Sequence, residues 1–589
     1  MSGRNVFTLL EETARVCGNA GALHQPSGSK AGGGHRTYSW NEWLEASREI
    51  ALGLRRLGLK NGEIAGILSE TRAEFYIVDL GIMGAGGVAG ALYTAYPVSE
   101  LARNITSIQP RFLFIEDAKL WQELADAIRT SGGAFPSEVI VMTGSPVEGT
   151  RGLADVQALG QQALAENPEE FKQIQETISP SDPAILYLTS GATGEPKMSL
   201  TSHAAVLANA DMAPIVLPIT PQDSTLVFLP SAHIAQRIVL EIVPMRMGTP
   251  VWFSESLNKL PNELRTIRPT MFLAPPRVWE RMYATIQNEG KRYGKTKQKI
   301  FRAALKLGIA ATRLREAGKR VPLHMAAALK MADRLVYRKI RERLGGRIRI
   351  AASGAAPLGR ELAEFYSGIG MPLFEGYGLT EAGVLCLNPL GHARPGSIGK
   401  ALPGVELRTA DDGELQVRTP CLFEGYYKDP AATRSVMTED GWFSTGDIAE
   451  SDADGYWYIT GRKKELIVSS NGKKIYPSRV ENLFKVEPVI NQILLIGDKK
   501  PYVTALLTVN TAQAQSLDVP VEKAVQEAVG RVNQQLADFE RIRRFRILQH
   551  DFSIERGELT PTMKIRRSRV LENYAPLLAE LYLGKEEMH

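Results

Sequence analysis

The chain of 589 residues is longer than one ordinary domain and suits two or three. Hydrophobic residues make up 44% and charged residues 23%, as in globular domains, and the net charge of +5 is too small to indicate a nucleic-acid partner. The three cysteines (Cys17, Cys386 and Cys421) lie far apart, which favours a reducing compartment over a disulfide framework or a structural zinc site.

The first part of the chain alternates helical and strand patterns. Helical spacing covers residues 40–57 and 73–84, and short apolar strands are predicted at 63–68, 111–115 and 138–142. Strands that alternate with helices indicate βαβ units and a mostly parallel sheet. In such sheets the ligand loops follow the carboxyl ends of the strands.

The longest apolar stretch covers residues 81–98. Glycines interrupt it and Tyr96 and Pro97 form a turn-like pair, so we expect a buried helix, turn and strand rather than a membrane span. Residues 1–12 contain no apolar signal core. We therefore expect a cytoplasmic protein.

A loop rich in glycine and hydroxyl residues follows a predicted strand at residues 184–188. Glycines allow the backbone to approach an anion closely and to aim successive N–H groups at it. Glu195 and Pro196 stand before the final lysine, so the loop is not a Walker A loop. On its own the pattern would also suit a surface turn. The residues expected to surround phosphate oxygens are Thr189, Ser190, Gly191, Thr193, Gly194 and Lys197.

Residues 291–347 contain 18 Lys and Arg residues and only three acids, so this segment carries +15. Phe301, Leu305, Ile309 and Thr312 recur at helical spacing, which predicts an amphipathic basic helix. Two interpretations stay open. The segment is either a solvated helical face, or a docking surface for an acidic partner or for anionic lipid at the inner face of the membrane.

The pattern changes again near residue 461. A strand predicted at residues 455–460 is followed by a polar, basic run at 461–465. Beyond it we expect short strands and one helix, which suits a small α+β domain.

Five further motifs follow the loop at residues 187–197. They are Ser353-Gly354-Ala355-Ala356-Pro357-Leu358, Glu375-Gly376-Tyr377-Gly378-Leu379-Thr380-Glu381, Ser444-Thr445-Gly446-Asp447, Gly461-Arg462-Lys463-Lys464 and Pro561-Thr562-Met563-Lys564. In this order the motifs resemble those of the adenylate-forming superfamily of acyl-CoA synthetases, firefly luciferase and peptide-synthetase adenylation domains. The resemblance extends from about residue 35 to about residue 570.

The resemblance implies an α/β fold with two domains. A large N-terminal adenylation domain, residues 1–461, would contain mostly parallel sheets flanked by helices and a small β-barrel-like subdomain. A hinge at residues 462–464 would join it to a small, mobile α+β domain at residues 465–589, which carries the adenylation lysine.

The implied reaction has two steps and uses ATP, Mg²⁺ and coenzyme A. A carboxylate attacks the α-phosphate of ATP, which gives an acyl-adenylate and diphosphate, and the thiol of coenzyme A then displaces AMP. The site must supply positive charge and hydrogen-bond donors where negative charge accumulates.

The resemblance also implies the catalytic residues. Lys564 would bridge the substrate carboxylate and the α-phosphate, and Thr380 would donate to the α-phosphate. Glu381 would bind Mg²⁺, together with Thr189, since this ion prefers one or two carboxylates plus phosphate oxygens. His233 would lie near the acyl carboxylate.

Nucleotide contacts are implied in the same way. Tyr377 would stack on adenine, and Asp447 would accept both ribose hydroxyls with help from Arg462. Rotation about Lys464 would present a coenzyme A-side loop formed by Ser470, Asn471 and Gly472. The remaining nucleotide contacts would be Gly354, Ala355, Ala356, Glu375, Gly376, Gly378 and Ile459.

The acid is expected to be a long-chain fatty acid. Gly378 stands where acetate-specific relatives place a tryptophan, so the acyl pocket should be open. Residues 229–237 contain no acid that could pair with the ammonium of an amino acid, and an unpaired buried carboxylate would be costly. This segment and residues 335–347 resemble the long-chain synthetases, although Ala235 and Gln236 depart from the usual pattern. The preferred chain length stays open.

Two alternatives differ in their acceptor or activity. A fatty acyl-AMP ligase would load an acyl carrier protein, but such enzymes carry an insertion after the magnesium motif, and residues 382–395 leave no room for one. A pseudo-ligase would bind acyl chains or nucleotide without turnover, and the presence of Glu381, Asp447 and Lys564 argues against it. The oligomeric state stays open.

Overall fold

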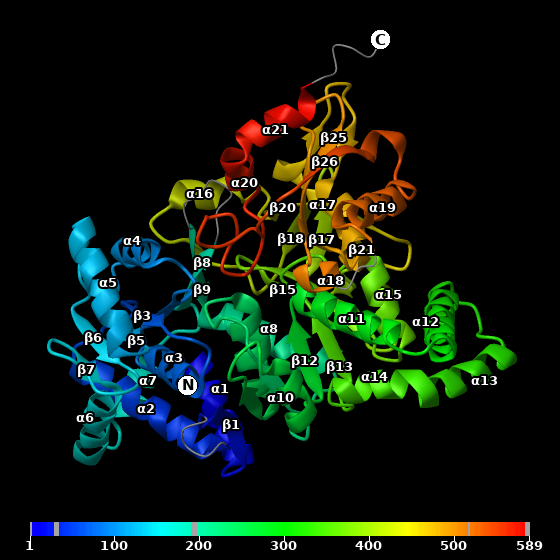
Figure 1. Cartoon of the computed structure of the whole chain (residues 1–589). Coiled ribbons are helices and arrows are strands. Elements are labelled where there is room, and N and C mark those ends of the chain that lie inside the picture. The colour runs from blue at the N-terminus through cyan, green and yellow to red at the C-terminus, as the bar shows by residue number, and fades with distance from the viewer. Residues whose placement is uncertain (1–2, 29–33, 190–196, 516–518, 584–589) are drawn as a thin grey trace.

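Two large β-sheets, formed by strands between residues 21 and 426, lie side by side (Figure 1). The computed structural model describes residues 3–28, 34–189, 197–515 and 519–583. The first sheet has eight strands in the order β19-β9-β8-β4-β3-β5-β6-β7. Strands β3 to β8 run parallel, and β9 and β19 close the edge in antiparallel fashion. The strands are β3 (Ile64–Leu68), β4 (Val88–Ala91), β5 (Phe112–Ile115), β6 (Glu138–Val141), β7 (Arg151–Gly152), β8 (Pro183–Thr189), β9 (Lys197–Ser202) and β19 (Gly425–Tyr426).

The helices between these strands confirm the predicted βαβ pattern. Ser39 caps helix α2 (Trp40–Arg56), and its backbone N–H donates to the Glu42 carboxylate at 2.7 Å in a capping box. Helix α3 (Ala73–Gly84) is buried on almost every side, which suits its apolar sequence. The other helices are α4 (Val98–Ile108), α5 (Ala118–Ser131), α6 (Leu153–Glu166) and α7 (Glu170–Glu176).

The second sheet has nine strands in the order β16-β15-β14-β13-β12-β10-β11-β1-β2. Its central strands are parallel, and β2, β15 and β16 are antiparallel at the edges. The strands are β1 (Gly21–Pro26), β2 (His35–Ser39), β10 (Thr225–Val227), β11 (Val251–Phe253), β12 (Met271–Ala274), β13 (Ile350–Ser353), β14 (Leu373–Leu379), β15 (Gly383–Leu387) and β16 (Lys400–Ala401). The associated helices are α8 (His203–Val216), the π-helix η2 (Ala235–Ile242), α9 (Val243–Met247), α10 (Leu260–Ile267), α11 (Pro276–Lys291) and α15 (Arg360–Gly368).

A buried ion pair joins the elements of the two sheets. Arg237 of η2 and Asp79 of α3 are both fully buried, with 2.9 Å between Nε and Oδ2, and Arg237 also donates to the Ala89 carbonyl of β4 at 3.2 Å. Glu241 lies in the same cluster, where burial raises the pKa of Asp79 and raises that of Glu241 well above its usual value. Arg237 therefore supplies the positive charge that stabilises these two buried carboxyl groups.

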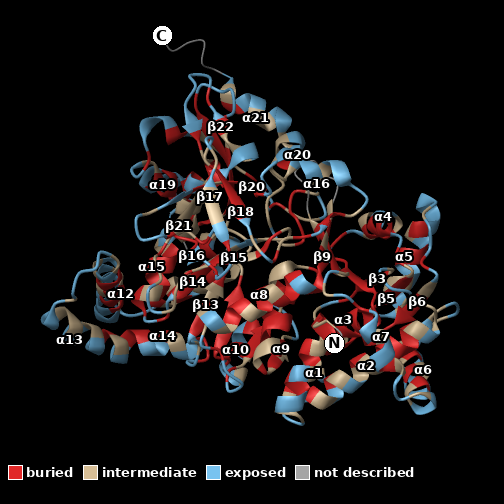
Figure 2. Ribbon diagram, turned by 180° about the vertical axis from the view of Figure 1, so that it is seen from behind, coloured by how far each residue is buried: buried red, intermediate tan, exposed pale blue. Residues whose placement is uncertain are grey.

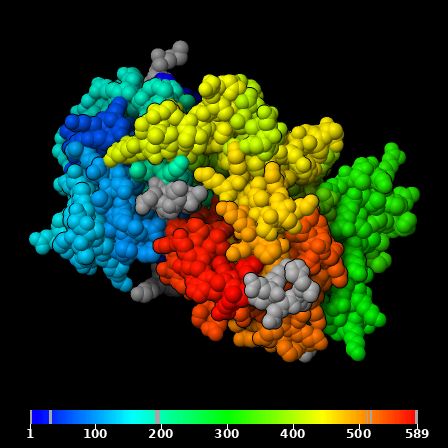
Figure 3. Space-filling model, turned by 90° about the horizontal axis from the view of Figure 1, so that it is seen from above, coloured from blue at the N-terminus to red at the C-terminus, as the bar shows by residue number. Residues whose placement is uncertain are grey.

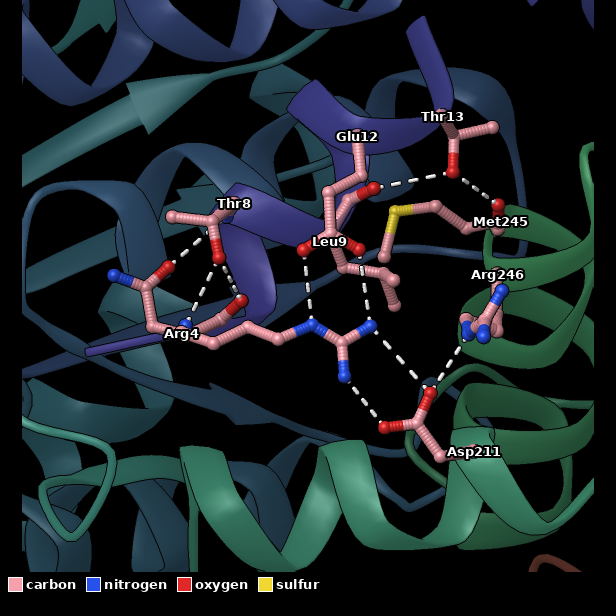
Figure 4. A network of polar contacts seen from close by, with 9 residues as sticks. Arg4, Thr8, Leu9, Glu12, Thr13, Asp211, Met245 and Arg246 are labelled. Atoms are coloured by element: carbon pink, nitrogen blue, oxygen red, sulfur yellow. Dashed lines mark hydrogen bonds and ion pairs between the residues drawn. The ribbon is translucent and has the colours of Figure 1, made fainter. Parts of the chain in front are cut away.

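The N-terminal helix α1 (Val6–Cys17) is tied to helices that lie far away in the sequence (Figure 4). Arg4 donates to Glu12 at 2.9 Å and to Asp211 of α8 at 2.5 Å. Asp211 also accepts from Arg246 of α9 at 2.7 Å. Arg4 thus ties the beginning of α1 to α8, and Asp211 extends the network to α9.

A smaller antiparallel sheet follows in the chain. Its four strands have the order β17-β18-β20-β21, and this open sheet is the part for which the sequence suggests a barrel-like subdomain. The elements are β17 (Glu406–Thr409), β18 (Glu414–Arg418), helix α16 (Pro430–Ser435), β20 (Phe443–Ser451) and β21 (Trp457–Arg462).

The basic segment at residues 291–347 is a helical arm that extends from one side of the molecule (Figure 1). Phe301, Leu305 and Thr312 of its first helix are buried, which confirms the predicted amphipathic pattern. Much of the outer surface of the arm is exposed (Figure 2). Its elements are α12 (Lys295–Glu316), α13 (Leu323–Ala332), the π-helix η3 (Asp333–Tyr337) and α14 (Arg338–Arg343).

The C-terminal part is a small α+β domain with its own core. Three strands, in the order β24-β25-β26, pack against helices, so the expectation of one helix is wrong. The extra helices are short and amphipathic, and they are hard to separate from loops by pattern alone. Viewed from above, this domain lies over the middle of the molecule (Figure 3). Its elements are the 3₁₀ turn η4 (Lys463–Glu465), β22 (Ile467–Val468), β23 (Lys474–Ile475), α17 (Pro477–Leu483), the 3₁₀ turn η5 (Phe484–Val486), β24 (Ile490–Ile496), β25 (Val503–Val509), α18 (Thr511–Ala514), α19 (Val521–Asn533), the 3₁₀ turn η6 (Asp538–Glu540), β26 (Ile542–Ile547), α20 (Arg567–Asn573) and α21 (Ala575–Tyr582).

The expectation for residues 81–98 is confirmed, because they form the end of α3, strand β4 and the turn before α4. No described helix is both long and apolar enough to cross a membrane. All three cysteines are free thiols.

Candidate active site

The predicted phosphate loop begins where β8 ends, at the carboxyl end of a parallel strand. Thr189, the last residue of β8, donates its hydroxyl to the Lys197 carbonyl at 3.2 Å, where β9 begins. Four predicted loop residues, Ser190, Gly191, Thr193 and Gly194, lie outside the described residues. The Lys197 ammonium lies 4.5 Å from the centre of the Tyr426 ring, a cation–π contact.

Glu381 lies in the tight turn between β14 and β15, next to Thr380. Its Oε1 accepts a hydrogen bond from the Tyr426 hydroxyl at 2.8 Å, so Tyr426 contacts Glu381 through its hydroxyl and Lys197 through its ring. Burial, and then the charge of Glu381, raise the pKa of Tyr426 far above its usual value, so the phenol stays protonated. No sequence pattern had marked Tyr426 as part of this site.

Gly378 is required by the backbone of this hairpin. A Cβ atom there would lie 2.3 Å from the Gly383 carbonyl oxygen on the neighbouring strand, which is too close for any side chain. Gly376 precedes it in the same strand. The glycine predicted to leave the acyl pocket open thus also allows the two strands to approach.

The loop after β13 is the predicted adenine-site loop and holds Gly354, Ala355 and Ala356. Ala355 has φ of 69°, a left-handed conformation that is costly for a non-glycine residue. The loop ends at Leu358, whose N–H donates to Glu375 Oε1 at 3.0 Å. Burial raises the pKa of Glu375 to about 7, although this hydrogen bond opposes the shift. The Glu375 carboxyl therefore supports the loop.

Asp447 and Arg462 are directly opposite one another in the β20–β21 ladder. The distance from Arg462 Nε to Asp447 Oδ1 is 3.0 Å, and the Tyr377 hydroxyl donates to Asp447 Oδ2 at 2.6 Å. Asp447 is 3% exposed, so both of its oxygens are held in a nearly buried position. Ile459 lies on the same strand as Arg462.

Lys564 reaches this site from the small domain. Its loop is held by a hydrogen bond from the Lys564 N–H to the Thr560 hydroxyl at 3.1 Å. Burial and the nearby charge of Arg462 lower the pKa of Lys564 to about 8, while Asp447 and Glu381 act in the opposite direction. The charges of Arg462, Asp447 and Glu381 thus all act on the Lys564 ammonium group.

His233 precedes η2 and also senses the charge of Lys564. Its Nδ1 accepts a hydrogen bond from the Ala235 N–H at 3.1 Å. Burial, and then Lys564, lower the pKa of His233 to about 3, so the ring is neutral at physiological pH. With Nδ1 as the acceptor, the proton belongs to Nε2, which can donate a hydrogen bond.

The predicted hinge and coenzyme A-side residues lie apart from this cluster. Ser470, Asn471 and Gly472 are exposed, and in the described part of the chain no hydrogen bond or ion pair joins them to Glu381, Asp447 or Lys564. Lys463 is held by Asp412 at 2.6 Å and Glu414 at 2.7 Å. The next residue, Lys464, is exposed and forms no ion pair with the described residues. Of these two neighbouring lysines, Lys463 is thus held by two acids of the large domain.

Comparison with known families gives two matches, one in each part of the chain. Residues 10–427 match the family described as AMP-binding enzyme, and residues 464–586 match the AMP-binding enzyme C-terminal domain. The gap between the two matches includes β20 and β21.

Curated relatives resemble the chain over nearly its whole length. The long-chain-fatty-acid–CoA ligase FadD15 of Mycobacterium bovis is 34% identical over 557 residues, which is 91% of this chain and 90% of that protein. The human long-chain-fatty-acid–CoA ligase ACSBG2 is 27% identical over 599 residues, covering 94% and 89% of the two chains.

Solved structures share the fold at low sequence identity. The adenylation domain of a carboxylate reductase from Mycobacterium chelonae has a TM-score of 0.76 at 21% identity and covers 99% of this chain and 92% of that chain. The anthranilate CoA ligase AuaEII, in complex with anthranoyl-AMP, has a TM-score of 0.75 at 20% identity and covers 99% of both. An α/β adenylation fold with a large and a small domain is confirmed.

Proposed function

The chain belongs to the AMP-binding enzyme family, and from this premise we propose that it is a long-chain fatty acid–CoA ligase. A fatty acid carboxylate oxygen attacks the α-phosphorus of ATP, and diphosphate leaves with the electron pair of the broken P–O bond. The coenzyme A thiolate then attacks the acyl carbon, and AMP leaves. The observation that carries this proposal is that Lys564 of the small domain lies near enough to Asp447 and Glu381 of the large domain for their charges to act on its ammonium group.

The proposed adenylation step depends on positive charge that is already in position before the reaction begins. Both the fatty acid and ATP are anions, so their approach requires a cation, and Lys564 supplies it from the small domain. His233, neutral and protonated on Nε2, would donate a hydrogen bond to the acyl carboxylate, and Thr380 would donate to the α-phosphate. Lys197 would add charge at the β- and γ-phosphates.

The ribose and the adenine of the nucleotide would contact different parts of the site. Asp447 would accept the ribose hydroxyls, a role favoured by its fixed position between Arg462 and Tyr377. The loop at Gly354, Ala355 and Ala356 would receive the adenine ring, which Tyr377 would cover.

The site also suits a magnesium ion bound mainly through ATP. In the described part of the chain no group of three His, Cys, Asp or Glu residues could hold a metal, so phosphate oxygens and water would supply most ligands. Glu381 uses Oε1 to accept from Tyr426, and no hydrogen bond to its Oε2 is found among the described residues. Glu381 would hold the ion, assisted by Thr189, and the bound ion would neutralise phosphate charge.

We also propose the domain division at residues 1–461, 462–464 and 465–589. Lys463 is held by two acids, whereas Lys464 has no ion pair with any residue that the structure describes, and this contrast supports a pivot at Lys464, about which the small domain would turn after adenylation. The turn would withdraw Lys564 and bring Ser470, Asn471 and Gly472 to the site for the coenzyme A step.

One experiment separates this proposal from its alternatives: acid-dependent diphosphate release over fatty acids from acetate to stearate, with and without coenzyme A. We expect release with long-chain acids and thioester formation when coenzyme A is added. Release without a thioester would favour a fatty acyl-AMP ligase that loads an acyl carrier protein. No release with any acid would favour a pseudo-ligase.

A peripheral contact with anionic membrane through segment 291–347 is a further part of the proposal. Its helix α13 and the π-helix η3 that follows present exposed apolar side chains, Leu323 (90% exposed), Met331 (65%) and Leu335 (50%). Lys330 and Arg334 lie beside them and form no ion pair with the described residues. Apolar side chains that enter the headgroup region, flanked by basic residues, are typical of such contacts.

The membrane contact is tested with vesicles of phosphatidylcholine, with and without phosphatidylglycerol. We expect retention at low salt on the anionic vesicles only, and its loss in a variant with Leu323→Asp and Met331→Asp. The matched control is Val16→Asp on α1, which changes an exposed apolar residue outside the arm (83% exposed). Equal retention of all variants would contradict the proposed surface.

A further inference from the structure

Lys485 of the small domain lies against the large domain. It belongs to the 3₁₀ turn η5, whose first residue, Phe484, is 2% exposed and anchors the turn in the small-domain core. The Lys485 ammonium donates to the carbonyl oxygen of Pro357, in the loop after β13, and lies 3.8 Å from Glu280 Oε1 on α11. One side chain of the small domain thus contacts two elements of the large domain.

The peptide group between Pro357 and Leu358 is bonded on both sides. Its C=O accepts from Lys485, and its N–H donates to Glu375 of β14 at 3.0 Å. Glu375 precedes Gly376 and Tyr377 on the same strand. The small domain is therefore connected, through one peptide group, to the loop and the strand proposed to hold adenine.

Lys485 is too enclosed to lose these partners without cost. Its side chain is 20% exposed and that of Glu280 is 12% exposed. A buried ammonium without partners is strongly unfavourable, whereas one that donates to a carbonyl and faces a carboxylate is stabilised. The contact therefore favours the domain arrangement in which it forms.

Two further contacts join the small domain to α11 and to the loop after β13. Arg277, one turn before Glu280 on α11, donates to the Asn491 carbonyl of the small domain and lies 3.4 Å from Glu280. Gly359, just after the loop, faces the small domain, because a Cβ atom there would be in ordinary van der Waals contact with the Asn482 carbonyl oxygen, at 3.5 Å. The loop and α11 together form one of the surfaces of the large domain that the small domain contacts.

We propose that Lys485 is a positioning residue for adenylation: its contacts with the Pro357 carbonyl and Glu280 hold the small domain in the orientation that brings Lys564 to the reacting groups. This inference rests on the proposed function. Lys485 does not touch the substrate. It acts through the domain arrangement, so it serves the first step and not the second.

The test measures the two steps separately in Lys485→Met. The first is diphosphate release from ATP and fatty acid without coenzyme A, and the second is thioester formation from synthetic acyl-adenylate and coenzyme A. We expect diphosphate release to fall about tenfold, within the usual range of a coupling between sites, while thioester formation stays equal or rises. Lys485→Arg, which keeps the charge and the donors, should restore most of the first step.

The matched control is Lys523→Met, which changes an exposed lysine on α19 of the same domain. Glu280→Gln provides a test from the large domain, because its effect should shrink in the Lys485→Met background if both act through one contact. Trypsin cleavage at residues 462–464 gives a readout besides activity, and it should be faster in Lys485→Met than in the control.

Equal losses in both steps, or no loss in either, would overturn the inference. A wild-type protein that releases no diphosphate with any acid would instead overturn the proposed function. The cleavage rates would still decide whether Lys485 holds the domains together.

Discussion

Asp447 and Arg462 face each other across the β20–β21 ladder, with 3.0 Å between Oδ1 and Nε. The register of the two strands fixes this pair, so the carboxylate has a set position before any ligand binds. Tyr377 holds the other carboxylate oxygen at 2.6 Å. A preorganised acceptor of this kind loses little freedom when it binds a diol.

Replacing the carboxylate tests this arrangement. Asp447→Asn removes the charge that Arg462 and Tyr377 support, and hydrogen bonds to charged groups contribute about 1.5–3 kcal/mol. We expect the Kd for AMP, measured by calorimetry, to rise about 10- to 100-fold. Asp454→Asn, in the turn between the same strands, is the control. An unchanged Kd would remove Asp447 from the nucleotide site.

Removing Lys564 should separate the two steps of the reaction. Loss of one well-placed donor or cation typically lowers kcat on the order of 10²- to 10³-fold, and we expect this loss for diphosphate release in Lys564→Ala. Thioester formation from supplied acyl-adenylate should be nearly unchanged, because the small domain would have withdrawn the lysine by then. Adenylation that persists at the wild-type rate would rule out this role.

The pH dependence of adenylation follows from the same lysine. Its pKa in the free enzyme is lowered to about 8, so Lys564 is charged below that pH and neutral above it. We expect kcat/KM for diphosphate release to fall as the pH rises through about 8. Lys564→Arg, which stays charged, should lack this alkaline fall even if its rate is lower. The same alkaline limb in both proteins would assign the fall to another group.

Glu381 should govern the magnesium requirement. In Glu381→Gln the proposed metal ligand loses its charge, and we expect the Mg²⁺ concentration for half-maximal diphosphate release to rise at least about tenfold. Calorimetry of ATP binding with and without Mg²⁺ provides a second readout. Glu424→Gln, an exposed change two residues before Tyr426, is the control. If both variants show the wild-type requirement, the metal is held elsewhere.

The buried Arg237 should matter for stability rather than chemistry. Arg237→Met would leave Asp79 and Glu241 buried without their cation, and breaking a buried pair costs about 3–5 kcal/mol. Urea unfolding of the large domain measures this loss. Arg246→Met removes a partly exposed arginine that pairs with Asp211 and should cost at most about 1 kcal/mol. Similar losses in both variants would contradict a special role for the buried cluster.

Local patterns predicted the elements of the large domain well. Strand β3 and helix α3 follow directly from apolar runs and helical spacing, and the loops after β8 and β13 lie at the carboxyl ends of strands, as parallel sheets require. The motif residues Asp447, Glu381 and Lys564 were identified by resemblance, and the fold brings them to one place.

Contacts between distant segments were not accessible from the sequence. Lys485 and Pro357 are 128 residues apart, and neither belongs to a periodic pattern that indicates its partner. Tyr426 likewise meets Glu381 through the fold, since β19 pairs with β9 and the nearby Phe423 N–H donates to the Glu381 carbonyl at 2.8 Å. The several short helices of the small domain were missed because their apolar faces become apparent only against the sheet that they cover.

The clamp on Lys463 has a consequence for the intermediate. Since Asp412 and Glu414 hold this lysine, Asp447 and Arg462, the pair proposed to bind ribose, would stay with the large domain when the chain turns at the proposed pivot, Lys464. The acyl-adenylate would then stay bound to the large domain. Meanwhile the small domain would withdraw Lys564 and present the proposed coenzyme A-side loop at Ser470, Asn471 and Gly472. A reactive mixed anhydride could thus pass from the first step to the second without being released into water.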